Sequence, residues 1–170
     1  MSKPIIAVLA ATLLSGACWG VDNVLPGLDR QDTDFARGAA LCSMLEVHAS
    51  DMALKRGLSG DDKIFAQLML ENHGSATKEL GVIAEKKGIT LPAEFDAKHL
   101  ELLEAVGKAN DKDVAERYLE IQIKAHKEAI ELFSTQADAG KDADLKAFAM
   151  ATLPVLKIHL EQARKLEEKH

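Results

Sequence analysis

Aromatic residues make up only 4% of this sequence, and it contains just two cysteines. Runs of β-branched residues are almost absent, whereas Leu, Ala, Glu and Lys, which favour helices, are abundant. This balance is typical of a helical protein rather than a sheet, and two cysteines are too few for a disulfide framework. We therefore expect an all-α protein, and its 170 residues correspond to a single domain.

Positive charge is also in the minority. Lys and Arg number 21 against 27 Asp and Glu, which gives a net charge of −6. A phosphate-binding surface, and with it a nucleic-acid partner, is therefore disfavoured. The chain contains no Gly-rich phosphate loop, no Gly-x-Ser-x-Gly elbow and no Cys with a partnered His, so no familiar catalytic motif names a reaction.

Residues 1–20 have the pattern of an export signal. Lys3 supplies a basic start, Ile5 to Leu14 is apolar, and Ser15 to Ala17 offers small residues at a cleavage point. The apolar stretch is about half of the roughly twenty residues that a permanent membrane span needs, although an uncleaved anchor remains the alternative. We predict a signal peptide over residues 1–20 and an exported protein of the periplasm or cell envelope.

Cys18 directly follows Ala17, so two fates stay open. A signal peptidase would cleave after Ala17, or a lipid would be attached to Cys18 and hold the protein at the membrane. Ser15 stands where a lipoprotein signal normally has Leu or a similar aliphatic residue, which disfavours lipidation. Cys42 could pair with Cys18 in an oxidising compartment, or serve as a small packed residue.

Apolar residues recur with helical spacing in four long stretches, separated by Gly and Pro. After a polar connector at residues 21–33, we expect long helices at about 34–56, 61–87, 111–139 and 143–169, and a short extra helix at 94–106. Two hairpins joined by a longer crossing predict an antiparallel, ferritin-like four-helix bundle over residues 34–170, with the short helix in the crossing. Pro154 lies inside the last helix, where we expect a kink rather than a break.

Four polar residues interrupt the apolar stripes, one in each long helix: Glu46, His73, His126 and His159. Polar groups in a core are costly unless they find partners. Counted from the turn of their hairpin at about 1.5 Å per residue, Glu46 and His73 lie at nearly the same height. His126 and His159 differ by roughly 4–5 Å, which helix tilt and the distortion at Pro154 can absorb. We expect the four side chains to share one layer.

Three imidazoles and a carboxylate are suitable donors for a transition metal such as zinc, copper or iron. We predict that Glu46, His73, His126 and His159 bind such an ion. No Glu-x-x-His occurs at these positions, which disfavours a di-iron centre; a mononuclear site, or one for copper or zinc assisted by Met69, fits better. Two alternatives remain: a metal-free hydrogen-bonded layer in a structural or stress-related bundle, and an enzyme with an open metal position.

Other candidates are weaker. One of them consists of Met44, His48 and Met52, whose four-residue spacing is typical of a copper-binding stripe. His48 is about 200° around the helix from Glu46, so it cannot join the interior site. His99 and His170 are expected to be solvated. The sequence does not determine the oligomeric state.

Several segments form a recognisable set. They are FARGAALCSMLEVHASDMAL, FAQLMLENHGSATKEL and AEKKGITLP, followed by YLEIQIKAHKEAIELF and LKAFAMATLPVLKIHLEQA. Together they resemble a bacterial exported family catalogued as domain of unknown function 4142, over about residues 34–166. The resemblance implies a ferritin-like bundle, a periplasmic or membrane-associated location, and Glu46 and the three His as metal-ligand positions. Asn72 departs from the family pattern, in which an acid commonly precedes the His, and the family supplies no established reaction.

Overall fold

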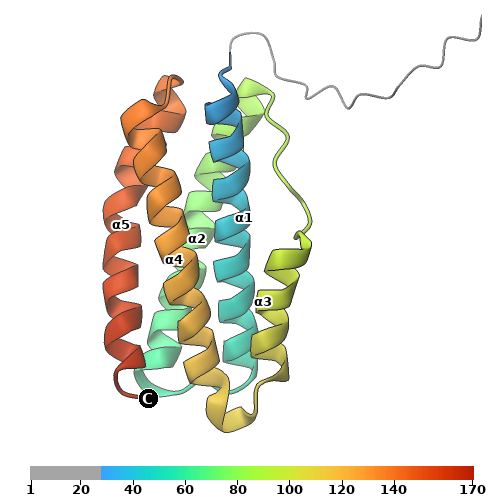
Figure 1. The fold of residues 1–170 in the computed structure, drawn as a ribbon, viewed down its shortest axis with the longest axis vertical. Helices are drawn as coiled ribbons and strands as arrows, with labels where there is room; N and C mark the ends of the chain where they lie inside the picture. The colour runs from blue at the N-terminus through green and yellow to red at the C-terminus, as the bar shows by residue number, and fades with distance from the viewer. Residues whose placement is uncertain (1–27) are drawn as a thin grey trace, which may run out of the picture.

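The computed structural model describes residues 28–170, and every regular element in that range is helical (Figure 1). The elements are α1 (Arg30–Lys55), α2 (Gly60–Lys87), α3 (Ala97–Lys108), a 3-10 turn (Asp111–Asp113), α4 (Val114–Ala139) and α5 (Ala143–Glu167). The all-α prediction is confirmed for this part of the chain. The predicted signal peptide, Cys18 and the first part of the connector lie outside the described residues.

The four long helices surround one interior. α1 packs against α2 and α4, and α5 packs against α4 and α2. Short turns make the pairs α1–α2 and α4–α5 antiparallel, and residues 88–113 cross the length of the molecule with α3 beside α1 (Figure 1). The predicted short helix in the crossing is therefore present.

The start of α1 differs from the expectation. The helix begins at Arg30 rather than near residue 34, so residues 30–33 of the predicted connector are helical. The cause is Asp29, whose carboxylate accepts a hydrogen bond from the backbone N–H of Gln31 at 2.9 Å and caps the helix. Polar composition alone suggested irregular chain here, whereas the capping contact starts a helix.

Two other boundaries also follow local chemistry. α3 begins at Ala97 rather than residue 94, because Asp96 accepts the backbone N–H of His99 at 3.0 Å. α2 ends at Lys87 and is capped by Gly88, which has a φ of 66° and therefore adopts the left-handed conformation that glycine tolerates. α5 is continuous through Pro154, so the prediction of no break is confirmed. None of the helices within residues 28–170 combines the length and apolar content needed to cross a bilayer.

The apolar core consists of two clusters with a polar layer between them. The first cluster contains Phe65, Met69, Tyr118, Leu119 and Leu166 among others. The second contains Phe35, Leu80, Phe133, Leu145 and Phe148 among others. In α2, α4 and α5 the boundary between the clusters falls at His73, His126 and His159, and in α1 it falls just before Glu46, between Cys42 and Leu45. Burying a large apolar side chain stabilises a fold by about 1.5–3 kcal/mol, so the clusters on both sides hold this layer in place.

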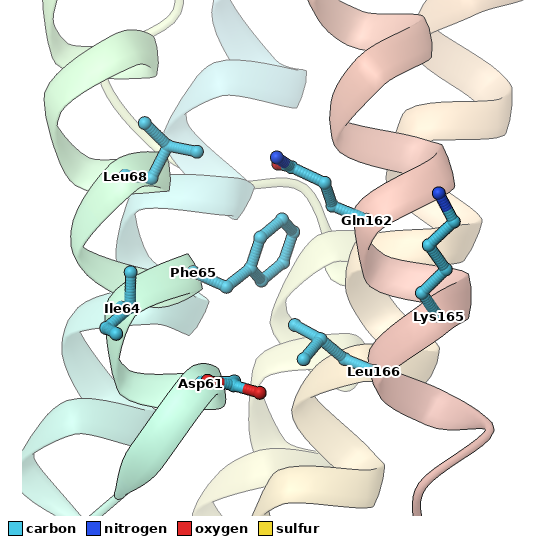
Figure 2. Close-up of a pocket in the computed structure, with 7 residues that line it drawn as sticks. All are labelled: Asp61, Ile64, Phe65, Leu68, Gln162, Lys165 and Leu166. Atoms are coloured by element: carbon cyan, nitrogen blue, oxygen red, sulfur yellow. The ribbon is translucent and has the colours of Figure 1, made fainter.

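α2 and α5 pack least closely of the four neighbouring pairs of long helices. A groove of about 230 Å³ lies between them (Figure 2). Its lining residues are Asp61, Ile64, Phe65, Leu68, Gln162, Lys165 and Leu166. Leu68 and Gln162 lie about one helical turn from the polar layer, so this groove ends close to it.

Candidate metal centre

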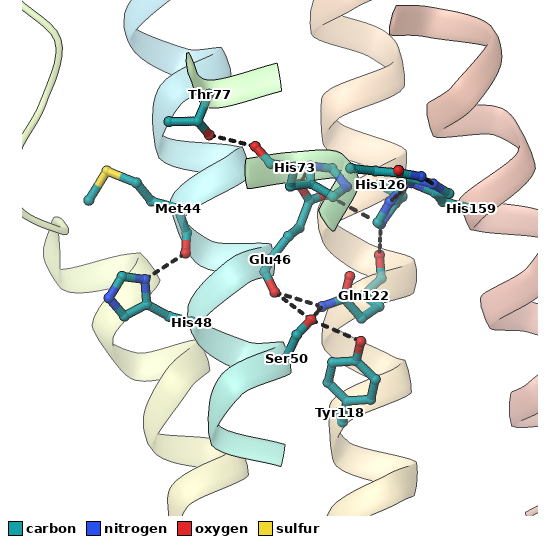
Figure 3. A network of polar contacts seen from close by, with 11 residues as sticks. Met44, Glu46, His48, Ser50, His73, Thr77, Tyr118, Gln122, His126 and His159 are labelled. Atoms are coloured by element: carbon teal, nitrogen blue, oxygen red, sulfur yellow. Dashed lines mark hydrogen bonds and ion pairs between the residues drawn. The ribbon is translucent and has the colours of Figure 1, made fainter. Parts of the chain in front are cut away.

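The structure brings the four predicted site residues together in the interior (Figure 3). α1 supplies Glu46, α2 supplies His73, α4 supplies His126 and α5 supplies His159. All four side chains are withdrawn from solvent, with exposed fractions of 0–3%. A layer of this kind needs internal partners, because water cannot satisfy its polar atoms.

The carboxylate of Glu46 bridges two of the rings. Its Oε2 lies 2.8 Å from Nδ1 of His73, and its Oε1 lies 3.3 Å from Nδ1 of His126. Glu46 therefore faces the Nδ1 side of both imidazoles. For His126, this is the side opposite the nitrogen that faces His159.

The three imidazoles face one another. Their ring centroids are 5.3–5.4 Å apart, and Nε2 of His126 lies 3.3 Å from Nδ1 of His159. One nitrogen from each of the three rings lies within 4.8 Å of the others, which makes them a group that could hold a metal ion. Neutral imidazole nitrogen is a common ligand for zinc, copper and iron.

The remaining ring nitrogens have distinct environments. Nδ1 of His126 donates to the backbone carbonyl of Gln122 at 2.8 Å, and the side-chain amide of Asn72 donates to Nε2 of His159 at 3.0 Å. Nε2 of His73 is buried and has no hydrogen-bond partner. The sequence stripes did not reveal that Asn72 contacts His159. The sequence feature that could have indicated this contact is that Asn72 directly precedes His73 in α2.

Burial and mutual charge determine the protonation of the layer. Burial opposes ionisation of Glu46, but the nearby His73 and His126 outweigh it and lower the pKa of the carboxyl. Burial lowers the pKa of His126, and burial together with the other two imidazoles lowers the pKa of His159 to about 3. His126 and His159 are therefore neutral near pH 7. Neutral imidazole is the form that binds metal.

A second set of polar contacts ties α1 to α4 beside the histidines (Figure 3). Ser50 donates to the backbone carbonyl of Glu46 at 2.7 Å, and its Oγ lies 3.0 Å from the phenol oxygen of Tyr118. The side-chain amide of Gln122 donates to the same carbonyl at 3.3 Å. Tyr118 is fully buried, and this burial raises the pKa of its phenol. The residue pattern did not predict these contacts between α1 and α4, because they join side chains of two different helices.

The structure also places Met69 and the predicted copper-binding stripe that contains His48. Met69, the suggested assisting ligand, is fully buried in the first apolar cluster. His48 is exposed, and its Nδ1 donates to the backbone carbonyl of Met44 at 2.9 Å (Figure 3). His48 lies outside the interior layer, as the helical spacing predicted.

The expectation of a solvated His99 is wrong. Only 11% of its side chain is exposed. Its Nδ1 lies 2.6 Å from the carboxylate of Asp96, and its ring stacks on Phe95 at a centroid distance of 6.2 Å. The cap of α3 and the preceding crossing segment cover this imidazole, and sequence spacing could not indicate that.

Cys42 packs at the edge of the second apolar cluster. Burial, with smaller contributions from Glu46 and Glu128, raises the pKa of its thiol to about 12. The thiol is therefore protonated and unreactive at neutral pH. These surroundings agree with the predicted role of a small packed residue. The alternative, a disulfide with Cys18, involves a residue outside the described range.

Comparison with known proteins gives a fold and a family. The chain is similar to the crystal structure of a DUF305 fragment from Deinococcus radiodurans, with a TM-score of 0.76 at 10% sequence identity. The match covers 85% of this chain and all of the fragment. At that identity, the likeness concerns the fold alone. No curated protein matches the chain. Residues 24–166 match the family described as Domain of unknown function (DUF4142), which the sequence motifs had indicated. The chain therefore belongs to the DUF4142 family.

Proposed function

We propose that this is an exported protein of the periplasm or cell envelope that binds one transition-metal ion inside a ferritin-like four-helix bundle. The ligands are one ring nitrogen each from His73, His126 and His159. The observation that carries the proposal is the convergence of these nitrogens within 4.8 Å in a buried layer. The N-terminal pattern of residues 1–20 supports export, and the ring of four long helices supports the bundle.

The spacing of the nitrogens suits a small ion. Ligand nitrogens at about 2.0–2.1 Å from a tetrahedral zinc ion are separated from one another by about 3.3 Å. Nε2 of His126 and Nδ1 of His159 already lie at 3.3 Å. The third ligand is assigned to His73, whose Nε2 is buried without a hydrogen-bond partner and which belongs to the group of rings with nitrogens within 4.8 Å of one another. One pair of ring nitrogens thus already has the spacing that a tetrahedral ion requires.

Partners on the other ring nitrogens support the same function. Histidines that bind metals usually have the second nitrogen held by a carboxylate, a carbonyl or a comparable group. His73 has Glu46, His126 has the carbonyl of Gln122, and His159 has the side chain of Asn72. Glu46 faces Nδ1 of both His73 and His126, so we assign it to orienting these rings rather than to direct ligation.

The donor set favours zinc, copper or iron over calcium and magnesium, which prefer oxygen ligands. A bound ion of this type with an open position supplies Lewis acidity or redox chemistry. The residues around it bury the layer and lower the pKa values of His126 and His159, which keeps these two imidazoles neutral, but they do not specify a substrate. The same site is suited to storing a metal, sensing it, or using it in a reaction.

A structural layer is the second candidate. The contacts between Glu46 and His73 and between His126 and His159 exist without a metal and could by themselves hold the helices in register. Elemental analysis separates the two functions. Protein purified from its native compartment without chelators should contain about one transition-metal ion per chain, and a chelator should remove it. Protein that is free of metal and takes up no zinc, copper or iron on reconstitution would support the structural layer.

A further inference from the structure

Asn72 is the group in the polar layer that can respond to a bound metal. It extends from α2 to α5, where its amide nitrogen lies 3.0 Å from Nε2 of His159. The side chain is partly buried, whereas the four residues of the polar layer, Glu46, His73, His126 and His159, are buried. It stands one turn after Leu68 on α2, and His159 stands just before Gln162 on α5, so the contact lies next to the end of the groove between these helices.

The hydrogen bonds specify which ring nitrogen carries the proton. Nε2 of His159 accepts from Asn72, so the N–H of the neutral ring is at Nδ1. That N–H faces Nε2 of His126 at 3.3 Å, and Nε2 of His126 is an acceptor because its Nδ1–H donates to the carbonyl of Gln122. The bonds therefore run in one direction, from Asn72 through His159 and His126 to Gln122.

This pattern of hydrogen bonds opposes metal binding at Nδ1 of His159. A metal ion needs the lone pair of Nδ1 of His159, but in the metal-free layer that nitrogen carries the proton. The ring must become the other neutral tautomer, with its proton on Nε2. An amide that donates to Nε2 opposes this change, whereas an amide oxygen at the same place would stabilise it.

We propose that Asn72 is a positioning residue whose side-chain amide turns over when a transition metal binds. In the metal-free protein its N–H group donates to Nε2 of His159; in the loaded protein its Oδ1 accepts from Nε2–H. One proton leaves Nδ1 and one is added at Nε2, so the ring neither gains nor loses charge. This inference rests on the proposed metal function. It adds a residue that couples the hydrogen bonding of the layer to metal affinity.

Substitutions at residue 72 separate the two roles of the amide. Asn72→Asp introduces a group that accepts but does not donate at neutral pH, so it should favour the metal-binding tautomer and raise zinc affinity about tenfold. Asn72→Leu removes both roles and should lower zinc affinity by about the same factor. Ser75→Asp is the matched control, since it places the same charge at an exposed position of α2 one turn away. Its zinc affinity should stay within about twofold of the unsubstituted protein.

The test combines zinc competition titrations of these four proteins with ¹⁵N NMR of their histidine rings. His159 should carry its proton on Nδ1 in the metal-free protein and on Nε2 in both the zinc-loaded protein and metal-free Asn72→Asp. An unchanged His159 tautomer on zinc loading would overturn the inference. So would equal gains in zinc affinity from Asn72→Asp and Ser75→Asp, because these would reflect charge alone. Absence of zinc binding in all four proteins would instead overturn the proposed function, while the metal-free tautomers still report on the Asn72 contact.

Discussion

Oε2 of Glu46 and Nδ1 of His73 lie 2.8 Å apart across the interface between α1 and α2. Both side chains are almost completely buried, and the other carboxylate oxygen of Glu46 faces His126. One acidic group thereby orients two imidazoles from two different helices. This relationship links helix packing to the proposed metal binding, because a carboxylate against Nδ1 leaves the opposite nitrogen of each ring for an ion.

Replacing Glu46 tests that link. Glu46→Gln keeps the size of the side chain but removes the negative charge that lies against Nδ1 of His73 and Nδ1 of His126, so zinc affinity should fall about 10–100-fold. The stoichiometry should remain one ion per chain, because all three histidines are retained. Competition titration with a zinc chelator measures both quantities. Glu131→Gln, on the exposed side of α4, is the control and should bind like the unsubstituted protein. Equal zinc affinities of all three proteins would show that Glu46 does not contribute to metal binding.

Metal should also stabilise the fold. An ion that binds only the folded chain adds about 2.7 kcal/mol to the free energy of unfolding when its free concentration is one hundredfold above its Kd. For a domain of this size, that corresponds to a rise in Tm of roughly 8 °C. Calorimetry with and without added zinc or copper at neutral pH measures the gain.

The matched variants for this measurement are His126→Ala and His99→Ala. His126→Ala should lose most of the metal-dependent gain, whereas His99→Ala should retain it because His99 lies beside Asp96 and Phe95, outside the layer. A purely structural layer gives a different result. In that case His126→Ala lowers the free energy of unfolding by about 1–3 kcal/mol, and metal changes the Tm of no protein.

Acid should destabilise the metal-free protein before any carboxylate titrates. The folded-state pKa values of His126 and His159 lie below the ordinary value of 6.5, with His159 at about 3. Below pH 6.5 the unfolded chain therefore binds protons that the folded chain does not, so stability is lost as the pH falls toward these folded-state values. Each histidine contributes a slope of up to about 1.4 kcal/mol per pH unit. The lowered pKa of Glu46 acts in the same direction at lower pH, below its ordinary value of 4.5.

Urea unfolding of chelator-treated protein between about pH 6.5 and 5 measures this slope. His159→Gln removes one titrating group, so its free energy of unfolding should depend less steeply on pH. Identical slopes for the two proteins would show that His159 is not held neutral in the folded state.

A separate prediction concerns the end of the bundle distant from the α1–α2 turn. The carboxylate of Asp32, only 1% exposed, accepts hydrogen bonds from the side chain of Gln136 at 2.6 Å and from the backbone N–H groups of Lys141 and Asp142 at 3.1 and 3.0 Å. Asp32→Ala should therefore lower the free energy of unfolding by about 3 kcal/mol, because it leaves buried donors without a partner.

Asp34→Ala is the control for this substitution, since the side chain of Asp34 is exposed and pairs with the exposed Arg30 at 3.6 Å. It should change stability by no more than about 0.5 kcal/mol. Neither substitution should alter zinc affinity. A loss at Asp32 as small as that at Asp34 would mean that the three contacts do not stabilise the connection between α1 and the α4–α5 turn.

Much of this protein follows from local pattern. Helical spacing predicted the four long helices and the short one, because a period of 3.6 residues places apolar side chains on one face. Turn positions predicted that Glu46 and His73 lie at the same height, because the rise per residue is constant along both arms of a hairpin. The same reasoning identified all four residues of the polar layer and excluded His48 from it. Both conclusions required only distances counted along one hairpin or angles around one helix.

Other features depend on contacts between helices, which one helical period cannot specify. The facing of Glu46 toward Nδ1 of two rings, the contact between Asn72 and His159, and the burial of His99 arise from side-chain directions and from segments that approach in space. The 3.3 Å separation of the facing nitrogens of His126 and His159 likewise required the packing of α4 on α5, since turn counting placed these residues at different heights. Sequence thus determined which residues enter the layer. The tertiary structure decided which atoms meet there, because ring orientation and tautomer are set by partners on neighbouring helices.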